Sequence, residues 1–367
     1  MKFNCLLETL CPRLAAVSHA VSAKASLPVL SHVLLEVYGK SLKLSATNLE
    51  LSITTDLPVE VEEEGSACVP GRIFLDLVSN LLHGPVIFSE KNNILTIKAE
   101  KASSKINGIN PAEFPKISTG GEALLSVDPK KFLKDLQAVV FSAASDESRP
   151  ILTGILLEAQ AGELVLVGVD GFRLSEKRTG VKITGPLKEV VPGKTLSEAA
   201  RLLSNEPSLD ILLSKEENQI LLKSANFEIV CRLLEGAFPE YQKIIPQNFV
   251  TRAETNGEEL KNALKIVTVF ARDEGSVVQV KIDPEKSLLT LSASASEIGE
   301  NETTVFSKIE GEKIEVAFNA KYLNDCLSNL SGEELEIKIT GPLTPGVFVP
   351  VGRTDYLHLI MPIRVQG

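Results

Sequence analysis

The sequence contains no tryptophan, only four tyrosines and no long apolar run. No stretch reaches the roughly 18 apolar residues that cross a bilayer, so we expect no membrane span and no membrane partner. The first residues, MKFNCLLETLCPRL, mix charged and apolar side chains and lack the apolar core of a signal peptide. The chain has 367 residues, of which 44% are hydrophobic, enough for a sizeable core. The composition predicts a globular, cytoplasmic protein.

Cysteine and histidine are too few and too scattered to predict a metal site or a disulfide framework. The five cysteines form no CxxC pair, and they are Cys5, Cys11, Cys68, Cys231 and Cys326. The four histidines show no ligand spacing, and they are His19, His32, His83 and His358. An odd number of unpaired cysteines is typical of a reducing compartment. We therefore expect no metal ion, no cofactor and no disulfide.

The motifs of common enzyme classes are also missing: GxGxxG, GxxxxGK[ST], HExxH and GxSxG do not occur. The fragment nearest to a catalytic site is Asp170-Gly171-Phe172-Arg173, in which Asp170 would act as a base and Arg173 as an anion clamp. The same fragment is typical of a tight turn, because glycine tolerates a positive φ. We favour the turn and predict no catalysis. An enzyme built on these two residues stays an alternative that would need a nucleophile or cofactor.

The net charge of −10 argues against a protein that coats DNA with a basic surface. Six helices are predicted from apolar spacing, at residues 6–24, 72–82, 128–144, 194–204, 258–271 and 321–330. These segments hold eleven basic and eight acidic side chains, so the excess acid lies elsewhere. Lysine is common on solvated helix faces, which is one interpretation. The other is a basic helical surface that touches phosphates on one face of an acidic protein.

Several blocks of sequence recur at a nearly constant interval. Residues 27–36 match 149–158, 47–49 match 169–171 and 70–72 match 192–194 at an offset of 122, while 113–115 match 237–239 at 124. A fainter third copy aligns 278–282 with 155–159, 319–321 with 192–194 and 361–362 with 238–239. We expect three domains, at residues 1–121, 122–247 and 248–367. Each follows the order helix, strands, helix, strands, which predicts an α+β domain with antiparallel sheets.

The segment from residue 149 to 178 illustrates this pattern best. We predict strands at 151–157 and 163–169, joined by a turn at Gln160-Ala161-Gly162, and a third strand after the Asp170-Gly171 turn. Helix starts are indicated by Asp128 before Pro129 and by Thr255 or Asn256.

Over its whole length the chain resembles the bacterial replicative sliding clamps, the β subunits of DNA polymerase III. The resemblance rests on the order of Leu27-Pro28-Val29-Leu30, Val69-Pro70-Gly71-Arg72, Val169-Asp170-Gly171-Phe172-Arg173-Leu174, Phe238-Pro239-Glu240-Tyr241 and Met361-Pro362-Ile363-Arg364. It implies three clamp domains, each with two inward helices on outer antiparallel sheets. Two chains would join head to tail into a ring around duplex DNA. Such a protein tethers the polymerase and is not itself catalytic.

The resemblance also implies a pocket for short peptides of partner proteins between the second and third domains. Its residues would be Leu152, Gly171, Phe172, Arg173, Leu174, Pro239, Lys243, Ile244, Leu359, Ile360, Met361, Pro362, Ile363 and Arg364. The expected partners are the polymerase catalytic subunit, the clamp loader, other polymerases and repair proteins. The chain departs from the family at Val169 and Phe172, where polar or histidine residues are common, and at Lys243, which replaces an arginine. Gly346 lies near a position that is usually polar.

Two further sets of residues follow from the resemblance. Lys24, Arg72, Arg149, Lys194 and, more weakly, Lys321 would face DNA. Ile106 of one chain would meet Val269 and Phe270 of the other at the dimer seam, although these residues could also belong to the cores of their own domains. A three-repeat peptide-binding scaffold that never encircles DNA stays the alternative function.

Overall fold

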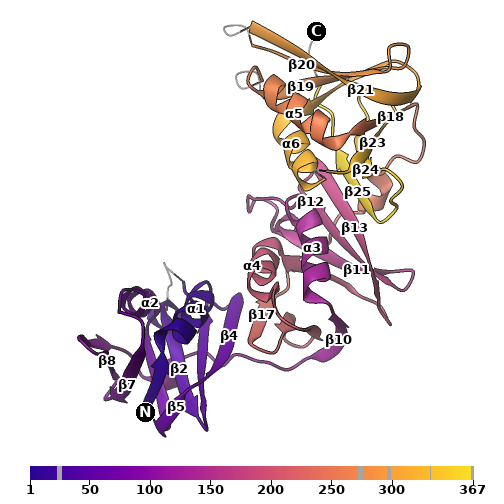
Figure 1. Cartoon of the computed structure of the whole chain (residues 1–367). Helices are drawn as coiled ribbons and strands as arrows, with labels where there is room; N and C mark the ends of the chain where they lie inside the picture. Colours follow the sequence, from indigo (N-terminus) through magenta and orange to yellow (C-terminus); the bar gives the residue numbers. More distant parts are fainter. Residues whose placement is uncertain (23–26, 272–275, 296–298, 331, 365–367) are drawn as a thin grey trace. The chain divides into compact units, whose positions relative to one another are not determined.

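The computed structural model describes residues 1–22, 27–271, 276–295, 299–330 and 332–364 (Figure 1). The chain forms two compact units: Met1–Lys134 with Lys194–Leu233, and Asp135–Gly193 with Leu234–Gly367. The central repeat is divided between the units because its strands join two different sheets, one with strands of the first repeat and one with strands of the third.

The first unit contains two sheets in which every strand pair is antiparallel. One sheet has the order β5 (Glu60–Glu63), β1 (Lys2–Leu6), β7 (Pro85–Lys91), β8 (Ile94–Lys98) and β9 (Ser103–Asn107). The other has the order β10 (Glu122–Val127), β15 (Leu209–Ser214), β16 (Gln219–Lys223), β17 (Phe227–Arg232), β4 (Leu51–Pro58), β3 (Ser41–Thr47), β2 (His32–Tyr38) and β6 (Gly65–Pro70). Its helices are α1 (Leu7–Ser18), α2 (Gly71–Ser79) and most of α4 (Gly193–Leu203), with η1 (Pro28–Ser31) and η2 (Pro111–Glu113) as short 3-10 turns.

The second unit is built on one long antiparallel sheet. Its order is β14 (Lys188–Pro192), β11 (Gly154–Gln160), β12 (Glu163–Val169), β13 (Arg173–Lys182), β25 (Tyr356–Ile360), β24 (Gly346–Pro350), β23 (Glu334–Ile339), β18 (Thr251–Asn256), β21 (Gly299–Gly311), β20 (Leu288–Ala295), β19 (Val277–Asp283) and β22 (Ile314–Asn319). The helices are α5 (Gly257–Thr268), α6 (Ala320–Asn329) and the end of α3 (Pro129–Val140), with η3 (Pro150–Thr153) and η4 (Tyr241–Ile244).

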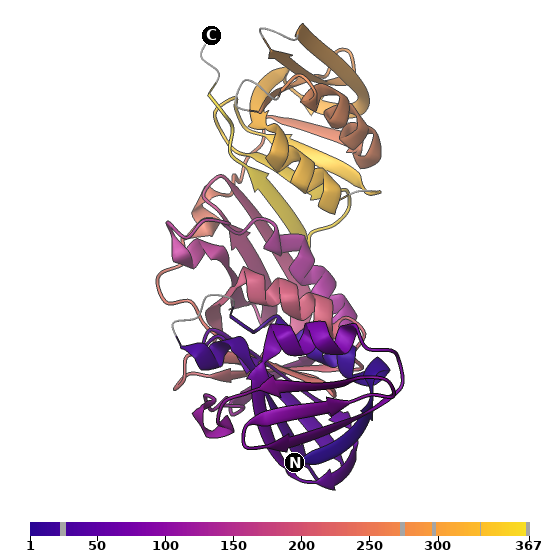
Figure 2. The ribbon, with the colours of Figure 1, turned by 90° about the vertical axis from the view of Figure 1, so that its left-hand side faces the viewer.

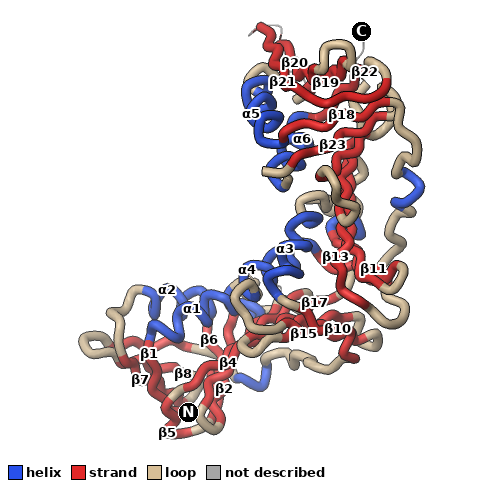
Figure 3. The backbone as a smooth tube through the Cα atoms, turned by 45° about the vertical axis from the view of Figure 1, so that its right-hand side comes forward, coloured by secondary structure: helices blue, strands red, loops and turns tan. Residues whose placement is uncertain are grey.

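The six helices expected from apolar spacing are confirmed, with differences at their ends. Asp128 accepts a hydrogen bond from the backbone N–H of Lys131 at 3.1 Å, and Asn256 accepts two at 3.0 Å at the start of α5. These side chains satisfy backbone donors that a helix start leaves unpaired. In Figures 2 and 3, α1 lies beside α2 and α5 lies beside α6, each pair packed on the sheets of its own unit.

The segment at 149–178 departs from expectation at its start. Residues 150–153 form η3 and not a strand, because Pro150 fixes its φ and the Thr153 hydroxyl donates to the Pro150 carbonyl at 2.7 Å. Strand β11 therefore begins at Gly154. The strand at 163–169 is confirmed, and so is the first turn, where Ala161 and Gly162 have φ values of 51° and 77°.

A single backbone hydrogen bond marks the same place in all three repeats. Ile109, Leu234 and Ile363 donate their N–H groups to the carbonyls of Cys68, Val190 and Ala317 at 2.9, 2.9 and 2.8 Å. Each carbonyl lies three residues before the first residue of the second helix of its repeat. Ile363 is therefore the equivalent of Leu234.

This equivalence corrects the third copy of the repeat. The alignment of Met361-Pro362 with Phe238-Pro239 is wrong, because Pro239 follows Leu234 by five residues whereas Pro362 precedes Ile363. After β25 the chain passes directly to the edge of β22, where Ile363 forms its hydrogen bond. Phe114 and Phe238 follow Ile109 and Leu234 by five and four residues, and both are buried over their sheets.

Candidate functional site

The junction of β13 and β25 brings together six of the expected pocket residues. Arg173 pairs with Ile360 and Leu174 with Leu359 in an antiparallel register. One step further, the N–H of Met361 donates to the carbonyl of Phe172 at 2.8 Å. Backbone pairing thus joins parts of the chain that are nearly 190 residues apart in sequence.

Alternation along the two strands divides these side chains between two faces. Leu174 and Leu359 are fully buried in an apolar cluster that includes Val169, Phe238 and Tyr241. Ile360 points to the opposite side, into the core of the third repeat. The two strands therefore offer buried aliphatic side chains on the face where the pocket is expected.

Around these buried side chains lie apolar side chains that face solvent. Phe172, Ile244 and Met361 are 60%, 45% and 38% exposed. Lys243 is exposed and paired with Glu240. Among the other expected residues, Leu152 is buried, Pro362 and Ile363 are half-buried, and Gly171, Pro239 and Arg364 are exposed. Exposed apolar groups near a buried aliphatic floor suit an apolar anchor of a peptide.

Arg173 is not an open anion clamp. Its Nε lies 2.9 Å from Oδ2 of Asp170, and its Nη1 lies 2.6 Å from Oδ2 of Asp325. Its guanidinium also stacks over the ring of Tyr322 at 4.6 Å. Asp170 Oδ1 accepts the N–H groups of Phe172 and Arg173, so the fragment is a capped turn with a partly buried ion-pair network. Removing one partner of such a network would leave an uncompensated charge.

Sequence reasoning missed the partners that α6 supplies. Tyr322 stacks with Phe172, with ring centroids 6.3 Å apart and an interplanar angle of 23°. Asp325 is the second partner of Arg173. Their spacing of three residues indicates that they share a helix face, but nothing local indicates what that face contacts.

Two departures from the family pattern have a packing explanation. A Cβ at Gly346 would lie 2.5 Å from the Phe318 ring, so a side chain there requires Phe318 to shift. Val169 is buried in the apolar cluster of the floor. Both residues serve the packing of the junction.

A buried polar network lies behind the same junction. Nδ1 of His358 lies 2.8 Å from the hydroxyl of Ser175, which lies 2.6 Å from that of Ser142. Burial lowers the pKa of His358 to about 3, and the Arg173 guanidinium acts in the same direction. The ring is therefore neutral at pH 7, and its Nε2 has no hydrogen-bond partner within the described residues.

Four of the expected DNA-facing residues are exposed. Arg72, Lys194 and Lys321 each occupy the second residue of a helix, α2, α4 and α6, and are equivalent in the repeat. Arg149 lies just before η3. Lys24 lies outside the described residues. Arg201 is basic and helical too, but it is held by Glu198 at 2.6 Å.

The expected seam residues differ in exposure. Ile106 is buried in β9, Phe270 packs partly on the core of the third repeat, and Val269 is about half exposed. Exposed apolar side chains that the sequence did not single out include Phe306 on β21, Leu82 after α2 and Ile266 on α5.

Within the described ranges, no three His, Cys, Asp or Glu side chains gather closely enough to hold a metal ion. Among the helices of the same ranges, none has the length and apolar character needed to cross a membrane.

Comparison with known proteins gives one consistent match. Models of the DNA polymerase III beta subunit match residues 1–118 with its N-terminal domain, 126–240 with its central domain and 242–364 with its C-terminal domain. The beta sliding clamp of Synechococcus elongatus is 28% identical over 375 residues, covering all of both chains. That of Staphylococcus aureus is 28% identical over 380 residues, covering 99% of each.

Solved structures agree. The sliding clamp of Bacillus subtilis superposes with a TM-score of 0.94 at 26% identity, and that of Pseudomonas aeruginosa with a TM-score of 0.93 at 26% identity. Both comparisons cover all of each chain.

Proposed function

Because the chain belongs to the DNA polymerase III beta subunit family, we propose that it is a sliding clamp that encircles duplex DNA and tethers the replicative polymerase. The observation that supports this most strongly is the match of three beta subunit domains, in order, to nearly the whole chain.

We further propose a non-catalytic role in the cytoplasm, with the clamp loader, other polymerases and repair proteins as partners. The domain bounds 1–121, 122–247 and 248–367 stay part of the proposal.

The proposed peptide site is the β13–β25 junction. Leu174 and Leu359 form its floor, and Phe172, Ile244 and Met361 supply exposed apolar contacts. A short partner peptide with a leucine or phenylalanine anchor would bind here. Because the contact is small, we expect a dissociation constant of roughly micromolar.

The repeat predicts how two chains would join. In each in-chain junction, the last strand of one repeat pairs with the third strand after the first helix of its neighbour: β17 with β4, and β25 with β13. The third equivalent junction would join β9 to β21 of a second chain. Within the described residues, β9 pairs only with β8, and residues 299–306 of β21 pair only with β20.

The same equivalence gives a register. Ser52 pairs with Val230, and Leu174 pairs with Leu359, at matching positions of the two in-chain junctions. The corresponding residues of the third junction are Glu300 and Lys105, both exposed and of opposite charge. Opposite charges that face each other across strands stabilise a pairing.

The proposed ring holds DNA by topology rather than by affinity. Tight direct binding would need many phosphate contacts and would weaken steeply with salt. A net charge of −10 does not favour such contacts, and Lys24, Arg72, Arg149, Lys194 and Lys321 would need only to approach phosphates as the ring slides.

The test is retention on DNA. After loading onto a nicked circle by an ATP-driven clamp loader, the protein should stay through a wash in 0.5 M salt, measured by gel filtration of labelled protein. Cutting the circle should release it within minutes, whereas blocking both new ends should retain it. Retention that vanishes with salt alone would contradict encirclement and favour a peptide-binding scaffold.

A further inference from the structure

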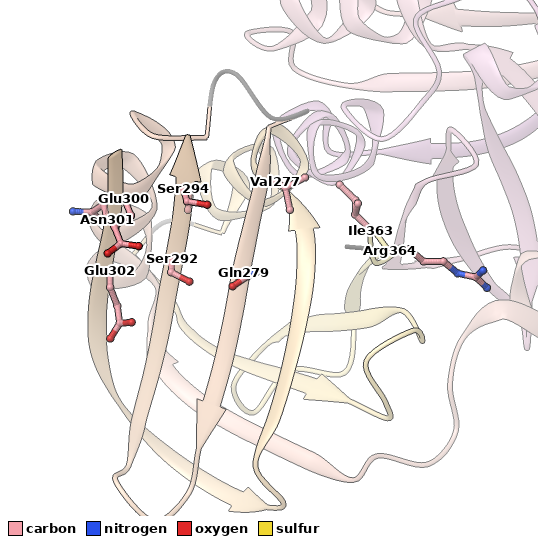
Figure 4. A pocket seen from close by; sticks show the side chains of 10 residues that line it. Val277, Gln279, Ser292, Ser294, Glu300, Asn301, Glu302, Ile363 and Arg364 are labelled. Atoms are coloured by element: carbon pink, nitrogen blue, oxygen red, sulfur yellow. The ribbon is translucent and has the colours of Figure 1, made fainter. Parts of the chain in front are cut away.

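A cavity of about 610 Å³ lies on the face of β19, β20 and β21, next to the end of the chain. Figure 4 shows that the side chains along it come from three neighbouring strands and from Ile363 and Arg364. Its lining residues are Val277, Gln279, Ser292, Ala293, Ser294, Glu300, Asn301, Glu302, Ile363 and Arg364. Four of these side chains are polar and uncharged, three are charged and three are apolar.

The cavity has an equivalent in the second repeat, where it is filled. The row Ala317, Gln279, Ser292 and Glu302 runs across β22, β19, β20 and β21. The matching row of the second repeat is Val190, Leu156, Val167 and Glu176. That row is covered by the segment that follows Leu234, because Phe238 and Tyr241 pack in one cluster with Leu156, Val167 and Val190.

The first repeat shows the same arrangement. Its segment starts at Ile109 on the edge of β6, and Phe114 then packs on Cys68 and Leu34. In both repeats the chain therefore leaves the same edge hydrogen bond, passes through a short 3-10 turn and packs an aromatic side chain on this face of the sheet. In the third repeat the hydrogen bond is present at Ile363, while the face is polar and forms the cavity.

We propose that this cavity receives an extended segment of the partner peptide, which continues from the peptide pocket and places a basic residue at Glu302. The inference rests on the proposed pocket. Ile363 and Arg364 line the cavity and are also among the residues expected in the pocket, so the two sites would adjoin.

The chemistry of the floor indicates what the segment carries. Gln279, Ser292 and Ser294 offer donors and acceptors to an extended backbone. Glu302 is exposed, whereas its equivalent Glu176 is contacted by Arg178 at 3.4 Å and by the Tyr241 hydroxyl. In the second repeat, where the sheet is covered, a cation and a hydrogen-bond donor thus contact this carboxylate. A basic side chain of the peptide would do the same at Glu302.

The sheet sets the spacing of the basic residue. Three strand intervals separate β22 from β21, which is about 14 Å at the usual strand spacing, and an extended peptide spans that distance in about four residues. Arg364 at the near end disfavours a basic residue close to the pocket. The basic residue should therefore lie four to five residues from the one beside Ile363.

Fluorescence anisotropy with the full chain tests this proposal. The probe is a hexapeptide with a leucine–phenylalanine anchor, alone or extended at either end by three serines and then two lysines, two serines or two glutamates. At low salt, the hexapeptide with the lysine extension at one of its ends should bind about fivefold more tightly than the hexapeptide with the serine extension. Glu302→Lys should abolish this gain and leave the affinity of the hexapeptide unchanged.

Glu310→Lys is the matched control, because it makes the same charge change on an exposed position of the same strand. It should leave the gain intact, and equal losses in both variants would overturn the proposal as a general charge effect. If the lysine extension raises the affinity at neither end of the peptide, the present proposal is overturned, and the proposed pocket is unaffected. A hexapeptide that fails to bind the wild-type protein would refute the pocket and this inference together. Both variants are compared as dimers, checked by sedimentation, because Glu302 lies on β21, the strand of the proposed dimer junction.

Discussion

At the scale of single residues, the fold opposes the ionisation of His358. It is fully buried beside Phe141, bonded through Nδ1 to Ser175, and its pKa is lowered to about 3 by desolvation and by Arg173. In the unfolded chain the imidazole titrates near 6.5. Between these two values the unfolded state binds more protons, so stability is complete above pH 6.5 and falls as pH decreases toward 3.

Replacing His358 should therefore change the pH dependence of folding. In His358→Gln, the loss of unfolding free energy between pH 6.5 and 4.5 should be smaller than in wild type by about 1.4 kcal/mol per pH unit. Urea unfolding at several pH values measures this slope. His83→Gln is the control for the substitution itself, since that side chain is 85% exposed. Parallel slopes for wild type and His358→Gln would show that the buried ring does not resist protonation.

At the scale of elements, η4 (Tyr241–Ile244) joins the covered sheet of the second repeat to the proposed peptide pocket. Tyr241 at its start is buried, accepts a hydrogen bond from Nε2 of Gln160 at 2.6 Å and meets the Phe238 ring edge-on. Burial raises the pKa of Tyr241 to about 12, so the hydroxyl stays protonated. Lys243 and Ile244 at the end of η4 are exposed and belong to the proposed pocket.

We expect Tyr241→Phe to weaken peptide binding about threefold, because η4 loses the hydrogen bond that orients Ile244. The same substitution should reduce the free energy of unfolding by about 1 kcal/mol. Tyr38→Phe removes a comparable hydroxyl, bonded to Asp56 at 2.8 Å in the first repeat, and should not change peptide affinity. Fluorescence anisotropy titrations measure the peptide affinity of both variants. Equal affinities would show that η4 does not contribute to the peptide site.

At the scale of the whole molecule, the prediction concerns closure of the dimer. If β9 of one chain pairs with β21 of another, Lys105→Glu and Glu300→Lys should each weaken the dimer about fivefold at low salt, since like charges would face each other across the strands. The double variant should recover wild-type affinity, measured by sedimentation equilibrium. Lys91→Glu changes an exposed charge elsewhere in the first repeat and should have little effect. A double variant weaker than either single variant would contradict the register.

The sequence predicted the features that depend on neighbouring residues. Apolar spacing located six helices, Asp128 and Asn256 marked two of their starts, and the glycine turns at 162 and 171 lie where expected. The recurrence at an offset near 122 indicated equivalent units, because each repeat forms the same local elements in the same order. Pro150 was the local signal that was overlooked, since it begins a 3-10 turn where a strand was expected.

Only the tertiary structure decided which distant segments meet. The pairing of β13 with β25 and the ion pair of Arg173 with Asp325 join residues more than 150 positions apart, and no local pattern specifies such a partner. The same holds for Ile363 on the edge of β22, whose hydrogen bond overturned the alignment of Met361-Pro362. Turns and helix caps are determined by bonds between near neighbours, whereas strand register and buried ion pairs depend on which surfaces the whole chain buries together.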